Sequence, residues 1–284
     1  MSISVSDELQ LFAQEIQSFL SPNILRDLAR DVGFVQRTSK YQAKDLVALC
    51  VWMNQNIATT SLTQLSSCLE ASTEVLISPE GLNQRFNQAA VQFLQHILAE
   101  LLNQKLASSM PISSPFTSVF KRIRILDSTA FQLPDLFSSV YPGAGGCSHT
   151  AGMKIQLEYD LLSGQFLHIH HCKKIKRERL ECHLYGQLIA ILLCSSIMFQ
   201  MQQLLLMKKK RELSEYKAIY MIKDYFLLLF QAIQKDTQEL SKILIRLFNL
   251  LQQNGRKSHR YEKKTVFDIL GVFYNCTMLD NQAA

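Results

Sequence analysis

The sequence predicts an α+β fold in which mostly helical N- and C-terminal regions flank a small antiparallel sheet. Apolar residues recur at three- and four-residue spacing over most of residues 7–106 and again after residue 179, which is typical of amphipathic helices. Between these regions, "RIRIL" (122–126) and "MKIQLEYDLLSGQFLHIHH" (153–171) alternate apolar and polar residues, as strands do. With 284 residues, 48% of them hydrophobic, the chain can bury a substantial core in one or two domains.

The N-terminal region, residues 1–106, is predicted to be helical and to resemble a DNA-binding region. Residues 7–30 form an amphipathic pattern in which "SPN" starts a second helix at Pro22, and the helical pattern continues at 41–54, 61–72 and 78–106. The short helices at 61–70 and 79–86 are spaced like a helix-turn-helix, in which Arg85 is the one basic residue that can face DNA. Any small bundle also turns a corner in this way, and the segment is acidic, so both interpretations stay open.

Residues 107–120 are predicted to be a linker, because "LASSMPISSPFTS" is rich in Ser and Pro and has no clear period. The strand that follows is expected to stop at Asp127, where the sequence turns to Ser, Thr and Pro. An aspartate in this position either starts a turn or is a carboxylate held at the rim of a sheet for a divalent metal ion. The second interpretation needs other carboxylates close by.

The rest of the region 121–172 is predicted to contain a loop and a hairpin that turns at Leu162–Gly164. "GAGG" (143–146) resembles a phosphate-binding loop, but it leads into a strand and not a helix, which favours a flexible connection. "HIHHC" (168–172) offers zinc ligands, but a cluster on one strand supplies a second ligand pair poorly, which favours a packed or solvated strand end.

Residues 173–284 are predicted to be helical, and no membrane partner is expected. The most apolar run, Leu188–Met207, is interrupted by two Ser and three Gln, which favours a buried helix over a membrane helix. The first residues lack the pattern of a secretory signal. Seven cysteines without a CxxC pair indicate a reducing compartment, so the expected location is the cytoplasm.

The positive charge is concentrated in this C-terminal region. Residues 1–120 carry 7 Lys and Arg against 10 Asp and Glu, residues 121–172 carry 4 of each, and residues 173–284 carry 19 against 10. Basic clusters either bind the phosphate backbone of nucleic acids or form solvated helix faces. The residues predicted to contact DNA are Arg85, Lys173, Lys174, Lys176, Arg177, Arg179, Lys208, Lys209, Lys210 and Arg211.

Four segments in order resemble the DDE transposases of bacterial insertion sequences, in the large family numbered four. They are "RILDST", the glycine loop, "GMKIQLEYDLLSG", and "KRERLECHLYGQLIAILL" with "KKKRELSEYKA"; "GLNQRFNQAAVQFL" (81–94) resembles the N-terminal region of one subgroup. The resemblance implies a ribonuclease-H-like core, here truncated to three antiparallel strands. It also implies that two aspartates and a glutamate hold two Mg²⁺ ions, which drive DNA strand cleavage and transfer. Asp127 matches the first aspartate, so it is the candidate catalytic residue and metal ligand.

The sequence departs from the family after the hairpin. In the family, the catalytic glutamate lies in a motif of Tyr, then Arg three positions later and Glu seven positions later. No Tyr in residues 128–284 is followed by this pattern, so the motif is absent. The second aspartate is missing too. Glu178 or Glu181 would have to replace them beside competing Lys and Arg side chains. We therefore expect an internally deleted copy without catalysis or firm Mg²⁺ binding.

The expected partners of such a copy are DNA at the terminal repeats of the element, a second copy of the chain, or an intact transposase, in the bacterial nucleoid. A purely regulatory DNA-binding product and a remnant without function are the alternatives.

Overall fold

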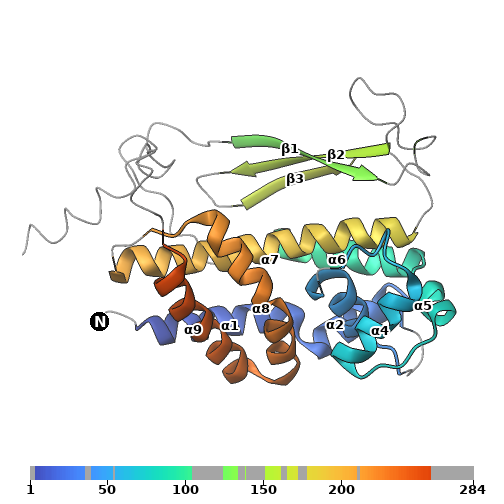
Figure 1. The fold of residues 1–284 in the computed structure, drawn as a ribbon, viewed down its shortest axis with the longest axis horizontal. Coiled ribbons are helices and arrows are strands. Elements are labelled where there is room, and N and C mark those ends of the chain that lie inside the picture. The colour runs from blue at the N-terminus through green and yellow to red at the C-terminus, as the bar shows by residue number, and fades with distance from the viewer. Residues whose placement is uncertain are drawn as a thin grey trace, which may run out of the picture. The chain divides into compact units, whose positions relative to one another are not determined.

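The structure is a computed structural model that describes residues 4–35, 40–53, 55–103, 124–133, 138, 151–160, 165–171, 178–209 and 212–256 (Figure 1). The structure describes only the backbone of Lys208, Lys209 and the strands. Ala151 and Gly152 are the strand residues whose burial is also described. The predicted linker, the "GAGG" loop and the turn of the hairpin lie outside the described residues.

The N-terminal region is helical, as predicted. Its elements are α1 (Val5–Leu20), α2 (Pro22–Asp31), α3 (Ala43–Val47), the π-helix η1 (Ala48–Trp52), α4 (Leu62–Thr73), α5 (Pro79–Arg85) and α6 (Gln88–Asn103). Local sequence explains the boundaries. The Ser4 hydroxyl accepts a hydrogen bond from the Asp7 amide at 3.1 Å and caps α1, while Ser21 adopts an extended backbone that lets Pro22 start α2.

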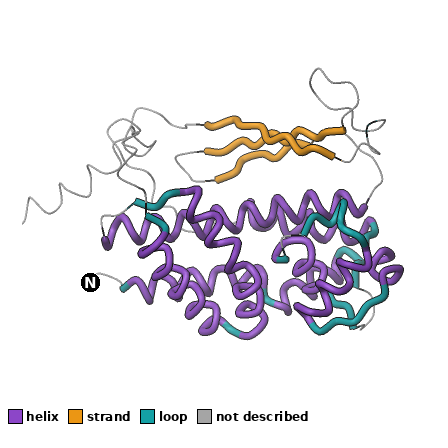
Figure 2. Tube along the Cα trace, in the orientation of Figure 1, coloured by secondary structure: helices purple, strands orange, loops and turns teal. Residues whose placement is uncertain are grey.

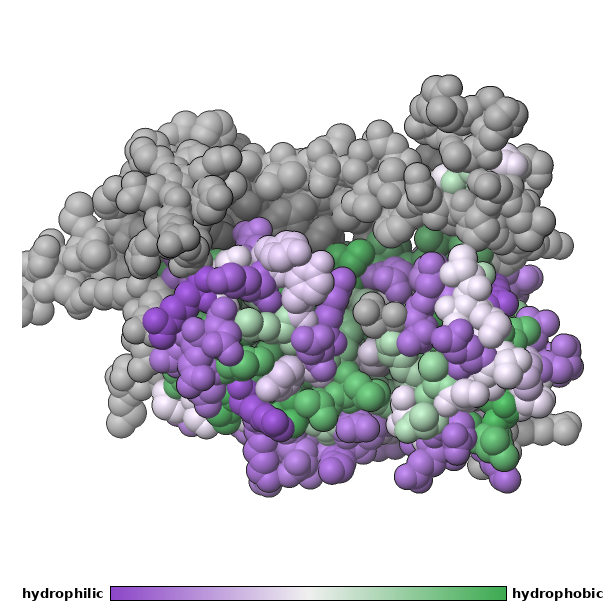
Figure 3. Space-filling view, viewed as in Figure 1, coloured by the Kyte–Doolittle hydropathy of each residue, from purple (hydrophilic) through white to green (hydrophobic). Residues whose placement is uncertain are grey.

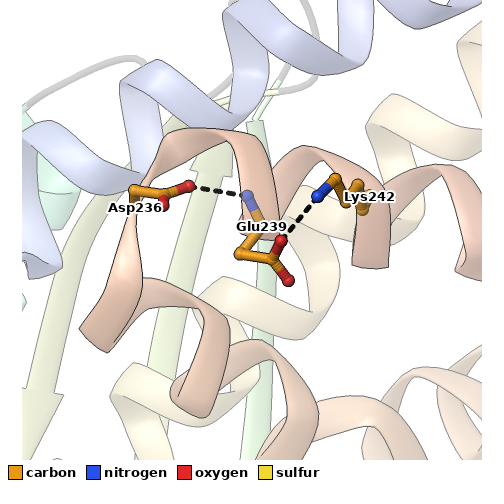
Figure 4. Close-up of polar contacts among 3 residues, drawn as sticks. All are labelled: Asp236, Glu239 and Lys242. Atoms are coloured by element: carbon orange, nitrogen blue, oxygen red, sulfur yellow. Dashed lines mark hydrogen bonds and ion pairs between the residues drawn. The ribbon is translucent and has the colours of Figure 1, made fainter.

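Three longer helices follow the sheet: α7 (Glu178–Lys209), α8 (Glu215–Lys235) and α9 (Thr237–Asn254). Asp236 separates α8 from α9, because its carboxylate accepts a hydrogen bond from the Glu239 amide at 2.8 Å and so caps α9 (Figure 4). The Glu239 carboxylate also pairs with the Lys242 ammonium at 2.6 Å, one turn further on. Gly255 ends α9, and its amide donates a hydrogen bond to the Leu251 carbonyl at 2.9 Å.

The first and last helical regions form one compact unit, residues 1–107 with 177–258, and residues 108–176 with 259–284 form another. In the helical unit, α1 packs on α9, α6 on α7, and α8 on both α7 and α9. The Gln17 side chain donates to the Ile233 carbonyl at 3.0 Å, across 216 residues of sequence. The helical unit is therefore discontinuous in the chain.

The π-helix η1 lies fully buried at the centre of the helical unit. Its Trp52 ring meets Phe226 of α8 edge-to-face, with ring centroids 5.1 Å apart. On α7, Gly186 faces the backbone of Cys50 so closely that a Cβ atom at this position would lie 2.4 Å from the Cys50 carbonyl oxygen. Only glycine allows α7 and η1 to approach to this distance.

Helix α7 is the apolar helix that the sequence predicted. Between Glu178 and Met207 it is long and apolar enough to cross a membrane, and half of its most apolar stretch is buried inside the protein. It packs against α6, η1 and α8, so core packing accounts for its composition. On the face of the molecule in Figure 3, hydrophilic side chains surround smaller groups of apolar ones.

The sheet contains three antiparallel strands in the order β1-β2-β3: β1 (Arg124–Leu133), β2 (Ala151–Asp160) and β3 (Gln165–His171) (Figure 2). The predicted end of the first strand was wrong. Strand β1 continues six residues beyond Asp127, which pairs with Leu157 in mid-strand. Ser128, Thr129 and Ala130 remain in β1 because β2 is equally long and pairs with them. The tendency of a residue to form a strand depends on its pairing partners as well as on its own type.

Candidate nucleic-acid interface

The two helices predicted as a helix-turn-helix are present as α4 and α5. Serine side chains begin both: Ser61 accepts from the Gln64 amide at 3.2 Å and Ser78 from the Gly81 amide at 3.1 Å. Glu74 ends α4 with a left-handed backbone (φ 59°), which turns the chain toward α5. Local sequence thus fixes the positions of both helices.

The exposed side chains of this pair are suited to contact base edges more than phosphates. Asn83 and Gln84 are exposed on α5, and side-chain amides of this kind can pair with adenine in the major groove. The nearby charges are mostly negative, because Glu70, Glu74 and Glu80 are exposed as well. These carboxylates oppose a phosphate backbone, so α4 and α5 need cations from elsewhere to bind DNA.

Arg85, the predicted DNA contact on α5, is half-buried. Its guanidinium lies over the Tyr41 ring, 5.5 Å from the centroid, which is the geometry of a cation–π contact. Burial raises the pKa of Tyr41 well above its usual value, so the ring presents a neutral face to the cation. Arg85 therefore joins the end of α5 to the start of the α3 region, and a DNA contact by Arg85 stays a prediction.

Arg179 has a structural contact that the sequence did not predict. Its Nε donates to the Ile57 carbonyl at 2.8 Å, one terminal nitrogen donates to the Thr60 carbonyl, and the guanidinium lies 6.0 Å from the Phe86 ring centroid. Partial burial lowers the pKa of Arg179. The side chain thus holds the segment before α4 against α7. Leu180 and Leu184, which follow Arg179 in sequence, are apolar and buried. They were a signal that the end of the basic stretch "KKIKRER" (173–179) enters the core.

Of the other residues predicted to contact phosphates, the structure describes only the backbone of Lys208 and Lys209. Lys208 and Lys209 lie in the last turn of α7, where positive charge is favourable at a helix C-terminus. Lys173, Lys174, Lys176, Arg177, Lys210 and Arg211 lie outside the described residues. Their contacts with DNA stay predictions.

Strand β1 places Asp127 among apolar partners. The register pairs Asp127 with Leu157 of β2 and pairs Leu157 with Ile169 of β3, so the row across the sheet contains one carboxylate. Mg²⁺ prefers several carboxylate oxygens, and two such ions need more negative charge than one aspartate supplies. The role of Asp127 as a catalytic residue and metal ligand stays a prediction. Among the described side chains, no three His, Cys, Asp or Glu come together as a metal site would need.

Buried ionisable groups near α3 and α7 support the fold. The Gln42 amide donates to the Asp45 carboxylate at 2.6 Å, in a capping box that starts α3, and burial raises the pKa of Asp45. Burial also raises the pKa of the Cys50 and Cys182 thiols and lowers that of His183 to about 4. Thiols kept protonated are weak nucleophiles, so these two cysteines are structural.

Comparison with known proteins identifies relatives over the whole chain. It is 36% identical to the transposase for insertion sequence element IS231E of Bacillus thuringiensis subsp. finitimus, in an alignment that spans 99% of both chains. It is 34% identical to the IS231F transposase of B. thuringiensis subsp. israelensis, over 96% of this chain and 98% of that one. The transposase for IS1151 of Clostridium perfringens is 28% identical over 61% of this chain and 37% of its own length.

The alignment with the IS231E transposase is much longer than this chain. It occupies 474 positions, whereas the chain has 284 residues, so at least 190 positions (474 less 284) are gaps in this chain. The gaps are internal, because the alignment reaches nearly to both ends of both proteins. No protein-family profile and no solved structure matches the chain. The identity and the coverage show that the chain belongs to the transposases of bacterial insertion sequences.

Proposed function

We propose that this chain is an internally shortened transposase that binds DNA, including the terminal repeats of its element, and does not cleave it. The observation that carries the proposal is the alignment, which retains both ends of the relative and omits at least 190 interior positions. The omitted part is the one that, by the family resemblance, holds the second aspartate and the glutamate. The chain would act in the bacterial cytoplasm, on the DNA of the nucleoid.

Three features support a truncated ribonuclease-H-like core. The sheet has three consecutive antiparallel strands, as the resemblance implies for the start of that fold. Asp127, which matches the first catalytic aspartate, lies on β1, an edge strand of the described sheet. The family places its second aspartate on a later strand, and among the described residues the element after β3 is the helix α7. One carboxylate neutralises too little of the charge of two Mg²⁺ ions, so we expect neither metal binding nor strand cleavage.

The helical unit supports retained DNA binding. It keeps α4 and α5 with exposed Asn83 and Gln84, and Arg179 ties the segment before α4 to α7. The excess of 19 basic over 10 acidic residues in 173–284 would supply the attraction to phosphates that α4 and α5 lack. Because both chain ends are retained, we expect that the protein can also pair with itself or with an intact relative.

A binding and cleavage experiment tests the proposal. The full chain is mixed with a labelled duplex that carries the terminal repeats of an IS231 element, at increasing salt, and with Mg²⁺ or Mn²⁺ for cleavage. The intact IS231E transposase is the positive control. We expect binding that weakens steeply with salt, no cleavage, and the same result for Asp127→Ala. Cleavage that Asp127→Ala abolishes would mean that a catalytic centre has been rebuilt, and absence of duplex binding would overturn the retained DNA-binding role.

A second variant assigns the binding to the basic cluster. Replacing Lys173, Lys174, Lys176 and Arg177 by Ala should flatten the salt dependence, because fewer counterions are then released. Arg179 is kept in this variant, since its loss would also loosen α7 from the segment before α4. An unchanged salt slope would assign the cluster to solubility.

A further inference from the structure

Two tyrosines on α8 are exposed side by side. Tyr216 is 71% and Tyr220 56% exposed, and their ring centroids lie 4.8 Å apart at an interplanar angle of 60°. They are four residues apart, so both lie on one face of the helix. A hydrogen bond with Tyr220 raises the pKa of Tyr216, which keeps that phenol neutral. Adjacent aromatic rings left in water are a feature of binding surfaces.

Positive side chains border the tyrosine pair. Lys223 is exposed less than one turn beyond Tyr220, and Lys217 donates from Nζ to the Arg256 carbonyl at 3.2 Å. Arg256 is itself exposed, with its Nε bonded to the Gln252 carbonyl at 2.8 Å. The carboxylates in this part are Glu215 and Asp224 of α8, which are exposed, and the half-buried Glu212 before it, so the described charges number three positive and three negative.

A short backbone bridge connects the residues before α8 to the residues after α9. Leu213 pairs with Arg256 in an antiparallel bridge, and the Ser214 amide donates to the Gly255 carbonyl at 2.8 Å. In sequence, Leu213 follows "KKKR" (208–211) by two positions, and Arg256 begins "RKSHRYEKK" (256–264). The two stretches contain nine Lys and Arg against one Glu. The described ends of the bridge, Leu213 and Arg256, therefore adjoin both basic stretches in sequence.

We infer that the Tyr216–Tyr220 pair, with Lys217, Lys223 and Arg256, is a binding surface for single-stranded DNA. The rings would stack on unpaired bases while the cations contact the phosphates on either side. The inference rests on the proposed DNA-binding function and adds a surface to it. Aromatic rings interleaved with basic residues are the usual means of holding a single strand without reading its sequence.

The chemistry favours a single strand over other occupants. The base faces of a duplex are already stacked on each other, so exposed rings gain little from it, whereas every unpaired base offers a free face. The two basic stretches that adjoin Leu213 and Arg256 in sequence favour a polyanion over a second copy of the chain, which would carry the same stretches and be repelled. A single strand combines this negative charge with free base faces.

The test compares single-stranded and duplex oligonucleotides of about 20 nucleotides, followed by fluorescence anisotropy with the full chain. Three variants are compared with the wild type. They should keep the wild-type fold, because Tyr216, Tyr220 and Lys217 are exposed. The double variant Tyr216→Phe/Tyr220→Phe keeps the rings, the double variant Tyr216→Leu/Tyr220→Leu removes them, and Lys217→Ala removes one cation. Lys235→Ala is the charge control, on the same helix and about 27 Å from Lys217 at 1.5 Å per residue.

We expect the Phe variant and Lys235→Ala to bind single strands as the wild type does. The Leu variant should bind them about five- to a hundred-fold more weakly, at unchanged duplex affinity, because base stacking is worth that factor. Lys217→Ala should weaken the binding and reduce its salt dependence.

Several results would overturn the inference. A Leu variant within about two-fold of the wild type would do so, as would a loss of self-association by light scattering in place of a loss of single-strand binding. A wild type that binds duplex but no single strand refutes this surface alone, whereas one that binds neither also refutes the proposed function.

Discussion

The close approach of α7 to η1 makes Gly186→Ala a sharp test of the packing. The added Cβ would lie 2.4 Å from the Cys50 carbonyl oxygen and 2.8 Å from the Cys50 Cβ atom, so one of the two helices has to shift. Overpacking a core usually costs about 1–3 kcal/mol, and a clash with backbone lies at the upper end. Alanine recovers up to about 1 kcal/mol of helix propensity. The net loss should be about 2 kcal/mol, which lowers the melting temperature by roughly 4–8 °C for a unit of this size.

The measurement is thermal and urea unfolding followed by circular dichroism, with Gly81→Ala as the matched control. At Gly81 the nearest atoms to an added Cβ would be side-chain atoms, Ser78 Oγ at 3.0 Å and Ile77 Cγ1 at 3.3 Å, and not backbone atoms. The control should stay within about 1 kcal/mol of the wild type. If Gly186→Ala is as stable as the wild type, or more stable, α7 and η1 do not pack as described.

Three further predictions concern other parts of the chain. Arg179→Ala should lower the free energy of unfolding by about 2 kcal/mol or more, because two charge-assisted hydrogen bonds to the Ile57 and Thr60 carbonyls are lost; an unchanged urea midpoint would contradict this. The pKa of His183 is lowered to about 4, below its value in the unfolded chain, so stability should fall as the pH drops from about 6.5 toward 4, by at most about 3 kcal/mol. His183→Gln should lack this component, and parallel pH profiles of variant and wild type would refute it. With β1 at an edge of the described sheet, the purified chain should self-associate, and a monodisperse monomer in light scattering would count against an incomplete sheet.

The helices were predictable from sequence because their signals are local. Ser61, Ser78 and Asp236 cap their helices as such residues usually do, and the apolar run Leu188–Met207 located α7. The end of the first strand was not predictable, because Ser128 and Thr129 favour a turn locally and only pairing with β2 keeps them in a ladder. Residues next to a turn signal can therefore form a strand when the fold supplies a neighbouring strand to pair with.

The candidate interface was only partly predictable, because charge in a sequence does not show what a side chain touches. Arg179 belongs to the basic cluster by sequence and bonds two backbone carbonyls in the structure. Tyr216 and Tyr220 belong to a helix with apolar spacing, and only their exposure distinguishes them from core residues such as Phe226 and Phe230. The bridge between Leu213 and Arg256 joins residues 43 positions apart and has no local signal.

The discontinuous helical unit has a consequence for synthesis on the ribosome. Gln17 of α1 meets its partner Ile233 only after 216 further residues have been added, which takes roughly 10–40 s at 5–20 residues per second. During this time the apolar face of α1 lacks α9 and is open to chaperones. Every residue removed from the middle of the chain shortens that interval, whereas the entropy of joining the ends changes only slowly with the length between them. A chain with fewer residues between α1 and α9 therefore completes this helical unit sooner.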